Sequence, residues 1–129
     1  LKAASRRTRL GVIYFGSTSP AMDEALAALD AAGIAVDGLR LRAYPFPASV
    51  REFIDAHEEV FVVEQNRDAQ MHCLLVNELD VDTARLVRVL HFDGTPITAR
   101  FITRAITQHV HAEVIAPQAK SNKSREKVV

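Results

Sequence analysis

The sequence has little of what would tie it to a membrane or to secretion. It has one cysteine, Cys73, so no disulfide can form within the chain, which fits a reducing cytoplasm better than a secreted scaffold. No run approaches the roughly 20 apolar residues of a membrane-spanning helix. The chain also lacks a charged-then-apolar signal peptide. We therefore expect a cytoplasmic protein that makes no use of a membrane.

Motifs for common cofactors and reactions are missing as well. The sequence has no G-x-G-x-x-G, no Gly-Lys-Ser/Thr phosphate loop, no nucleophile elbow and no four-cysteine set for an iron–sulfur cluster. Its histidines show no metal-ligand spacing with a carboxylate or with the cysteine. These are His57, His72, His91, His109 and His111. We therefore expect no catalytic residue, no metal site and no cofactor bound by this chain itself.

The charges cancel in total but are unevenly placed. Of 129 residues, 16 are Lys or Arg and 16 are Asp or Glu, and every lysine lies near one of the two ends. The stretch between these basic ends is acidic, which argues against a nucleic-acid-binding face. We interpret residues 1–9 as a linker or fragment start, since the chain opens without Met, residues 10–111 as one domain, and residues 112–129 as a basic, disordered tail. A polyanion-binding tail is the alternative for that end.

Apolar runs of strand length alternate with helical patterns along the body. The predicted strands are residues 10–15, 36–42, 60–63 and 86–90. Apolar residues at helical spacing follow each of them. We expect Ser19, Asp68 and Thr95 to cap three of these helices. The strict alternation predicts an α/β fold of three layers, with a mostly parallel sheet and helices on both faces.

The strand Val60–Val63 is the most informative one, because polar residues follow it directly. Four consecutive apolar residues are typical of a strand buried on both faces of a parallel sheet. Glu64, Asn66 and Gln70 come at its carboxyl end, where open α/β sheets build their sites. We interpret Glu64 as an ionised, structural carboxylate that accepts amide hydrogen bonds in the turn and at the next helix start. The alternative is a catalytic acid or base.

Two further segments are candidates for contacts. Residues 16–19 follow a strand and open a helix, so they form either a capping turn or an anion site. Tyr44-Pro45-Phe46-Pro47 cannot be helical, because each proline restricts the residue before it. Its aromatic rings and fixed shape suit a contact with a neighbouring domain or subunit. The alternative is that Phe46 covers this domain's own core.

Several of these segments together resemble one family. Glu64-x-Asn66-x-x-x-Gln70 after the buried strand resembles the C-terminal region of the alpha subunit of 2-oxoacid:ferredoxin oxidoreductases. Three further pieces agree with that region in order and spacing. They are Tyr14-Phe15-Gly16-Ser17 with Glu24-Ala25-Leu26, Leu39-x-Leu41 with Pro45-Phe46-Pro47, and Asp93-Gly94-x-Pro96. The resemblance covers about residues 10–109, and the 2-oxoglutarate branch looks most similar.

The resemblance implies a transketolase C-terminal-like domain whose sheet includes one antiparallel strand. It implies an enzyme that oxidatively decarboxylates a 2-oxoacid with coenzyme A, giving acyl-CoA, carbon dioxide and reduced ferredoxin. Thiamine diphosphate, Mg²⁺ and an iron–sulfur cluster would be held by the beta subunit and other domains. This domain would serve assembly and would be inactive alone. Its structural or interface motif would comprise Gly16, Ser17, Pro45, Phe46, Pro47, Glu64, Asn66 and Gln70.

One position departs from the family pattern. The family usually has glycine just before the glutamine, where this chain has Ala69, and that puts a ligand contact at this helix start in doubt. Two functions of other classes stay open. One is a self-standing nucleotide- or coenzyme-A-binding module that uses Gly16 to Ser19. The other is a flavodoxin-like regulatory domain, which would need an aspartate cluster where this chain has Glu64 alone.

Overall fold

The computed structural model describes residues 9–42 and 44–126, with side chains for all of these except Ser17 and residues 113–126. Within this part of the chain, strands and helices alternate. The strands are β1 (Leu10–Phe15), β2 (Val36–Leu41), β3 (Glu59–Glu64) and β4 (Leu86–Leu90). The helices are α1 (Ser19–Ala31), α2 (Ala48–Asp55), α3 (Gln70–Leu79) and α4 (Ala99–Glu126), with 3-10 turns η1 (Gly16–Thr18) and η2 (Thr83–Arg85). None of the helices described is both long and apolar enough to cross a membrane.

The strands form one sheet in the order β2-β1-β3-β4. Every pairing among the described residues is parallel, with Leu10 of β1 opposite both Val36 and Glu59. The predicted α/β fold is therefore confirmed. The antiparallel strand implied by the resemblance is wrong for this part of the chain. Each crossover contains a helix, as parallel neighbours require.

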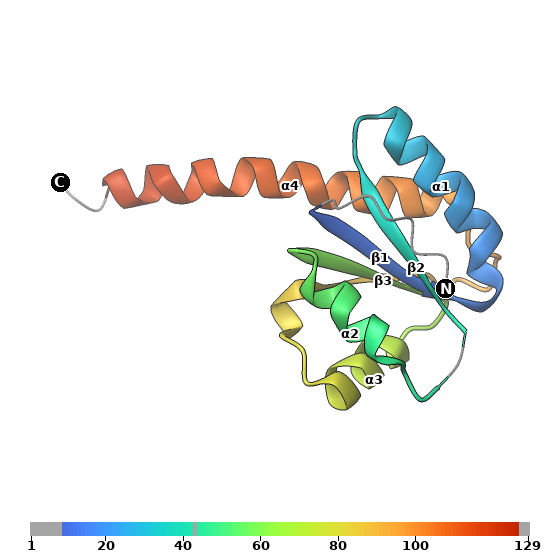
Figure 1. The fold of residues 1–129 in the computed structure, drawn as a ribbon. Helices are drawn as coiled ribbons and strands as arrows, with labels where there is room; N and C mark the ends of the chain where they lie inside the picture. The colour runs from blue at the N-terminus through green and yellow to red at the C-terminus, as the bar shows by residue number, and fades with distance from the viewer. Residues whose placement is uncertain (1–8, 43, 127–129) are drawn as a thin grey trace.

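Two apolar cores sandwich the sheet, so the molecule has three layers (Figure 1). Alternate residues of a strand face opposite sides, which is why neighbouring β1 residues Val12 and Ile13 belong to different cores. The first core packs α1 and α4 on one face of the sheet. It includes Met22, Ala25, Leu29, Phe61, Ile102 and Ile106. The second packs α2 and α3 on the other face and includes Leu39, Val50, Ile54, Val62 and Leu75.

The helices begin at other residues than the sequence predicts. No side chain of the described residues caps α1, which starts at Ser19 itself with its hydroxyl buried. Helix α3 starts at Gln70, two residues after the expected cap Asp68. Helix α4 starts at Ala99, where the hydroxyl of Thr98 accepts the N–H of Phe101 at 3.1 Å. Thr95 lies four residues before the start of α4, and its hydroxyl donates to Asp93 in the preceding turn.

Helix α4 continues past the body of the domain and projects from it as an arm (Figure 1). The sequence predicts a disordered tail from residue 112, but the backbone is helical through Glu126. The buried turns around Ile102 and Ile106 hold the first part of this helix against the sheet. The predicted linker falls almost entirely on residues 1–8, which lie outside the described residues, as do residues 127–129.

Candidate functional site

The carboxyl edge of the sheet is where this fold would build a site. The chain leaves β1 to form β2 on one side and later returns to form β3 on the other side. The strand order therefore reverses between β1 and β3, and ligands of open α/β sheets bind in the crevice beside such a switch point. Of the predicted residues, Gly16 and Ser17 follow β1, Glu64 is the last residue of β3, and Asn66 lies in the loop after it.

Glu64 closes this end of β3 as a cap for α3. It points to the same side of the sheet as Val60 and Val62, under the start of α3, and it is fully buried. Its Oε1 accepts the backbone N–H of Met71, and its Oε2 accepts that of His72 at 3.1 Å. These amides belong to the first turn of the helix, whose N–H groups have no partner within the helix. A buried carboxylate thus faces the positive end of a helix dipole.

The rest of the motif completes the same cap. Asn66 donates from Nδ2 to Oε1 of Glu64 at 3.0 Å, and its Oδ1 accepts the backbone N–H of Gln70 at 3.3 Å. Gln70 contributes its main chain, since its side chain lies at the surface. The three residues of Glu64-x-Asn66-x-x-x-Gln70 are therefore brought together, and what they form is a helix cap. The amide hydrogen bonds predicted for Glu64 are present, and its role in function stays a prediction.

Ala69 explains the glycine of the family pattern in physical terms. Its backbone is left-handed, with φ 51° and ψ 47°. Such a conformation costs a residue with a Cβ about 1–2 kcal/mol, and glycine adopts it freely. Ala69 is also buried, and its carbonyl accepts the N–H of Cys73. The backbone conformation of the turn suffices to favour glycine here, without a ligand.

A hydrogen bond spans the switch point. Gln65, in the loop after β3, donates from Nε2 to the buried hydroxyl of Thr18 in the loop after β1, at 3.1 Å. The two loops that would open a ligand crevice are thus joined to each other. Gly16 lies on the β1 side with φ 62°, and an added Cβ there would meet no atom within 4 Å. Its glycine is needed for the backbone conformation, whereas a close approach of another group is not seen among the described residues.

The connector after β2 divides between the core and the surface. Phe46 packs against the core beneath α2 and α3, while Tyr44 is 59% exposed and meets the Phe46 ring edge-on at 5.5 Å. Glu78 of α3 raises the pKa of the Tyr44 phenol through its charge and a hydrogen bond. Pro45 and Pro47 lie at the surface around them. The connector also borders a cavity of about 260 Å³. Its other lining residues include Phe15, Gly16, Leu41, Arg42, Met71 and Leu74.

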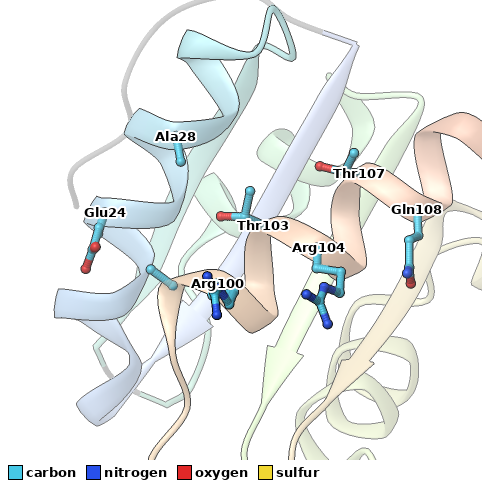
Figure 2. A pocket seen from close by; sticks show the side chains of 8 residues that line it. Glu24, Ala28, Arg100, Thr103, Arg104, Thr107 and Gln108 are labelled. Carbon is cyan, nitrogen blue, oxygen red and sulfur yellow. The ribbon is translucent and has the colours of Figure 1, made fainter.

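A second groove lies away from the carboxyl-edge loops, between α1 and α4 (Figure 2). Its volume is about 390 Å³, and residues of these two helices line it. Glu24 and Ala28 come from α1, and Arg100, Thr103 and Arg104 from α4. None of the site residues predicted from the sequence lines this groove.

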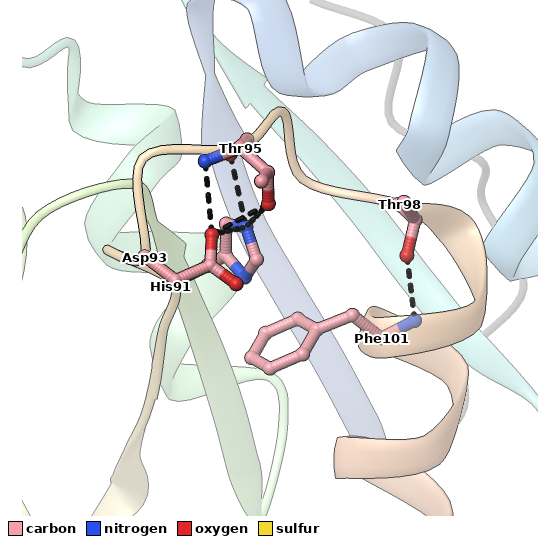
Figure 3. A network of polar contacts seen from close by, with 5 residues as sticks. All are labelled: His91, Asp93, Thr95, Thr98 and Phe101. Atoms are coloured by element: carbon pink, nitrogen blue, oxygen red, sulfur yellow. Dashed lines mark hydrogen bonds and ion pairs between the residues drawn. The ribbon is translucent and has the colours of Figure 1, made fainter.

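The loop between β4 and α4 carries a polar network that sequence reasoning missed (Figure 3). His91 lies with Nε2 3.1 Å from Asp93 Oδ1 and 3.0 Å from the carbonyl of Thr95. Thr95 donates to Asp93 from its hydroxyl and its backbone N–H, and these bonds lower the pKa of the Asp93 carboxyl. Asp followed two residues later by Thr is an Asx-turn signal that could have found it. The network fixes the loop that presents Phe92, which is 60% exposed.

A buried histidine–aspartate pair lies at the opposite, amino edge of the sheet. His57 Nε2 lies 2.8 Å from Asp37 Oδ2, and His57 Nδ1 lies 2.6 Å from the carbonyl of Phe53. Each ring nitrogen of His57 therefore lies within hydrogen-bond distance of an oxygen. Packing leaves no room for a ligand here, since a Cβ on Gly11 would come within 2.8 Å of the Phe53 ring. Twenty residues separate the partners, so no local spacing reveals them.

The described residues do not fit thiamine diphosphate with its metal. Among them, no three His, Cys, Asp or Glu side chains gather as a metal ion would need. Mg²⁺ requires an octahedral set of oxygens, and both oxygens of Glu64 already accept protein N–H groups. The polar side chains at the carboxyl edge instead connect β3 to the start of α3 and to the loop after β1.

Comparison with solved structures shows what this fold is similar to. The 2-oxoglutarate:ferredoxin oxidoreductase of Magnetococcus marinus, solved with 2-oxoglutarate, coenzyme A and succinyl-CoA bound, matches 78% of this chain with a TM-score of 0.70 and 24% identity. The alpha chain of a probable 2-oxoacid ferredoxin oxidoreductase from Thermoplasma acidophilum matches 80% of this chain and 89% of its own length, with a TM-score of 0.53 and 21% identity. This chain shares its fold with part of these enzymes.

The extent of these matches differs between the two structures. The chain spans 18% of the length of the Magnetococcus protein, so it corresponds in fold to one part of a larger chain. No family profile matches the sequence. No curated protein sequence matches it either. The similarity to these enzymes therefore rests on the comparison of structures.

Proposed function

We propose that this chain is a transketolase C-terminal-like accessory domain of the alpha subunit of a 2-oxoacid:ferredoxin oxidoreductase. The carrying observation is the likeness in fold, over about four-fifths of the chain, to two chains of such enzymes. The assembled enzyme would oxidatively decarboxylate a 2-oxoacid with coenzyme A and pass the electrons to ferredoxin. The Magnetococcus structure was solved with 2-oxoglutarate and succinyl-CoA, and together with the sequence resemblance this supports the 2-oxoglutarate type.

The role proposed for this domain is support for the chemistry, which other parts of the enzyme carry out. Glu64 is the polar residue best placed for catalysis, but it is fully buried. Its two carboxylate oxygens accept hydrogen bonds from Asn66 and from the first turn of α3. A general acid or base must instead reach a substrate proton directly or through one water. Thiamine diphosphate, Mg²⁺ and an iron–sulfur cluster would be held by other domains and by the beta subunit.

The carboxyl edge is the face proposed to meet those neighbours. Among the described residues, the large hydrophobic side chains that are exposed are Tyr44 and Phe92, which follow the two outer strands at this same edge. Aromatic residues are enriched at protein interfaces, because they bury a large area and lose little rotamer freedom. Arg42 lies beside Tyr44 in the cavity wall and forms no ion pair with a described residue, so it is available to a carboxylate of a neighbour.

The second candidate function is a self-standing module that binds coenzyme A or a nucleotide at Gly16 to Ser19. It is favoured by the open Gly16 turn at the start of α1. The Gln65–Thr18 hydrogen bond opposes it, because this bond holds together the two loops between which a phosphate would enter. Calorimetric titration of the chain with coenzyme A, and separately with thiamine diphosphate and Mg²⁺, separates the two functions. The accessory domain binds neither, whereas micromolar affinity, about 8 kcal/mol, would favour the module.

The direct test uses the complete protein that contains this sequence, produced together with its proposed beta subunit. Reduction of ferredoxin is followed with 2-oxoglutarate and coenzyme A together, and with each omitted. We expect a rate that requires both. Pyruvate and a branched 2-oxoacid serve as controls for the type of substrate. A complete protein that oxidises no 2-oxoacid would refute the proposed function.

A further inference from the structure

The cavity beside the connector after β2 lies at the carboxyl edge of the sheet, the edge at which open α/β folds bind their ligands. Its volume is about 260 Å³, and it lies between the ends of β1 and β2 and the first turns of α3. Phe15 and Leu41 line it from the strands, and Met71 and Leu74 line it from the helix. All four side chains are apolar, and a mostly apolar wall with few polar groups is typical of a site for a small molecule.

The connector supplies another part of the wall in a fixed arrangement. Phe46 packs against the core beneath α2 and α3, and the Tyr44 ring meets it edge-on at 5.5 Å. Glu78 of α3 forms a hydrogen bond with the Tyr44 phenol and raises its pKa, so this phenol stays neutral. The two rings are therefore held between the connector and α3, and a wall fixed in advance loses little freedom when a ligand binds.

Arg42 gives the cavity a single charge. It is the one ionised side chain among the described residues that line the cavity, and this lining includes no acid. Glu78 is engaged by Tyr44 and does not line it. Arg42 is exposed, and within residues 9–42 and 44–112 it forms no ion pair. Its flat guanidinium suits a carboxylate, which it can bind through two parallel hydrogen bonds.

The size and the polar groups of the cavity argue against larger and more highly charged ligands. Sites for drug-sized molecules hold roughly 300–1,000 Å³, so a whole nucleotide or coenzyme A is too large. A phosphate would need several donors, and the amides of the first turn of α3 already donate to protein oxygens. Met71 and His72 donate to Glu64, and Gln70 donates to Asn66. The ligand that fits has one negative charge and an apolar body.

We propose that this cavity binds a small monocarboxylic acid with a ring or a branched apolar tail. The carboxylate pairs with Arg42, and the tail lies against Phe15, Leu41 and Leu74. The same guanidinium is available to a carboxylate of a neighbouring subunit, and the two sources share one chemistry. A free acid is favoured because the cavity is concave and has room for a buried ring. The inference concerns binding alone and does not depend on oxidation of a 2-oxoacid, so either can fail without the other.

Calorimetric titration of the full chain tests the inference with 3-phenylpropanoate as the probe. 3-Phenylpropanol lacks the charge of the probe, and propanoate lacks its ring. We expect a dissociation constant below about 1 mM for the probe. Each analogue should bind at least about tenfold more weakly, since each has lost one of the two kinds of contact. No saturation by the probe up to about 10 mM, or equal binding of the uncharged alcohol, would overturn the inference.

Two substitutions locate the binding. Arg42→Met removes the charge at similar length and should weaken binding of the probe about tenfold, while 3-phenylpropanol should bind as before. Leu74→Trp fills the cavity from α3 and should abolish binding of the probe. Arg104→Met, at an exposed arginine of α4 on the other face of the sheet, is the matched control and should bind the probe like the unchanged chain. Undiminished binding to Arg42→Met would overturn the inference, and circular dichroism separates lost binding from lost folding.

The complete protein distinguishes a free acid from a carboxylate of a neighbour. Saturation-transfer difference NMR of the probe is recorded with the complete protein and with its Arg42→Met variant. We expect a signal from the phenyl protons that is weakened in the variant. A probe that binds the 129-residue chain but gives no signal with the complete protein would assign the cavity to a neighbouring subunit and contradict the inference.

Discussion

Glu64 Oε2 lies 3.1 Å from the backbone nitrogen of His72, so the last residue of β3 caps an amide of α3 that is eight residues further along the chain. The residue directly before α3 gives no cap, since the side chain of Ala69 cannot accept a hydrogen bond. The carboxylate of Glu64, at the end of β3, accepts the free N–H groups of the first turn of α3 instead. The end of β3 and the start of α3 therefore form one unit.

Glu64→Gln should lower the free energy of unfolding of the chain by about 1–2 kcal/mol, the scale of a charge-assisted hydrogen bond. The amide keeps the shape of the side chain but loses the charge, and its NH₂ group faces amide donors. Chemical denaturation with a circular dichroism signal measures the difference. Glu58→Gln, at an exposed carboxylate, is the matched control and should change stability little. Equal effects of the two substitutions would show that the cap formed by Glu64 does not stabilise the chain.

Ala69→Gly should stabilise the chain by about 0.5 kcal/mol. Relief of the left-handed conformation of Ala69 outweighs the greater backbone freedom of glycine in the unfolded chain and the loss of one buried methyl group. Ala27→Gly, at an exposed position inside α1, should instead destabilise the chain by about 1 kcal/mol. The two substitutions have the same chemistry and opposite expected signs. A destabilising Ala69→Gly would show that the methyl group matters more than the backbone.

The strands and the layer order could be predicted because they depend on local apolar pattern. Val60 to Val63 are apolar without interruption, and the structure buries all four between two helical layers. The helix starts could not be predicted in the same way. Asp68 has the usual chemistry of a cap, yet the carboxylate four residues before it reaches the amides of α3, and nothing local in the sequence ranks one acid above the other.

The candidate site was predictable in part for the same reason. Glu64 and Asn66 are close in sequence, so their position after a buried strand revealed them. The pair of Asp37 and His57 was not predictable, because it forms only when the sheet and α2 bring the two residues together. The Gln65–Thr18 bond, which spans forty-seven residues, is of the same kind.

His72 should make the chain less stable in mild acid. Burial lowers its pKa from the usual 6.5, the charge of Arg88 lowers it further, and the carbonyl of Leu86 and Glu64 offset part of this. The unfolded chain then binds a proton that the folded chain resists, so stability is complete above about pH 6.5 and is lost as the pH falls toward the lowered value. His72→Gln should reduce the loss of unfolding free energy between about pH 7 and pH 5. An unchanged pH dependence would contradict this assignment.

The phenol of Tyr44 should have a pKa above that of an ordinary tyrosine because of the nearby carboxylate of Glu78. The charge of that carboxylate and its hydrogen bond disfavour the phenolate and raise the pKa from 10.0. The chain has two tyrosines, and burial together with Asp23 raises the pKa of the other, Tyr14. An alkaline absorbance titration of Glu78→Gln should show one phenol shifted downward. Tyr44→Phe, which leaves Tyr14 alone, assigns the signal, and an unshifted curve in Glu78→Gln would refute the contact.

If this domain supports an oxidoreductase whose chemistry lies elsewhere, loss of the Glu64 charge should affect the stability of the domain and leave turnover unchanged. Glu64→Gln is introduced into the complete enzyme, and thermal stability is measured beside the steady-state rate with 2-oxoglutarate, coenzyme A and ferredoxin. We expect a lower melting temperature of the domain and a rate close to that of the unchanged enzyme. A rate reduced about a hundredfold at an unchanged melting temperature, the loss expected for an acid–base group, would instead show that Glu64 takes part in the reaction.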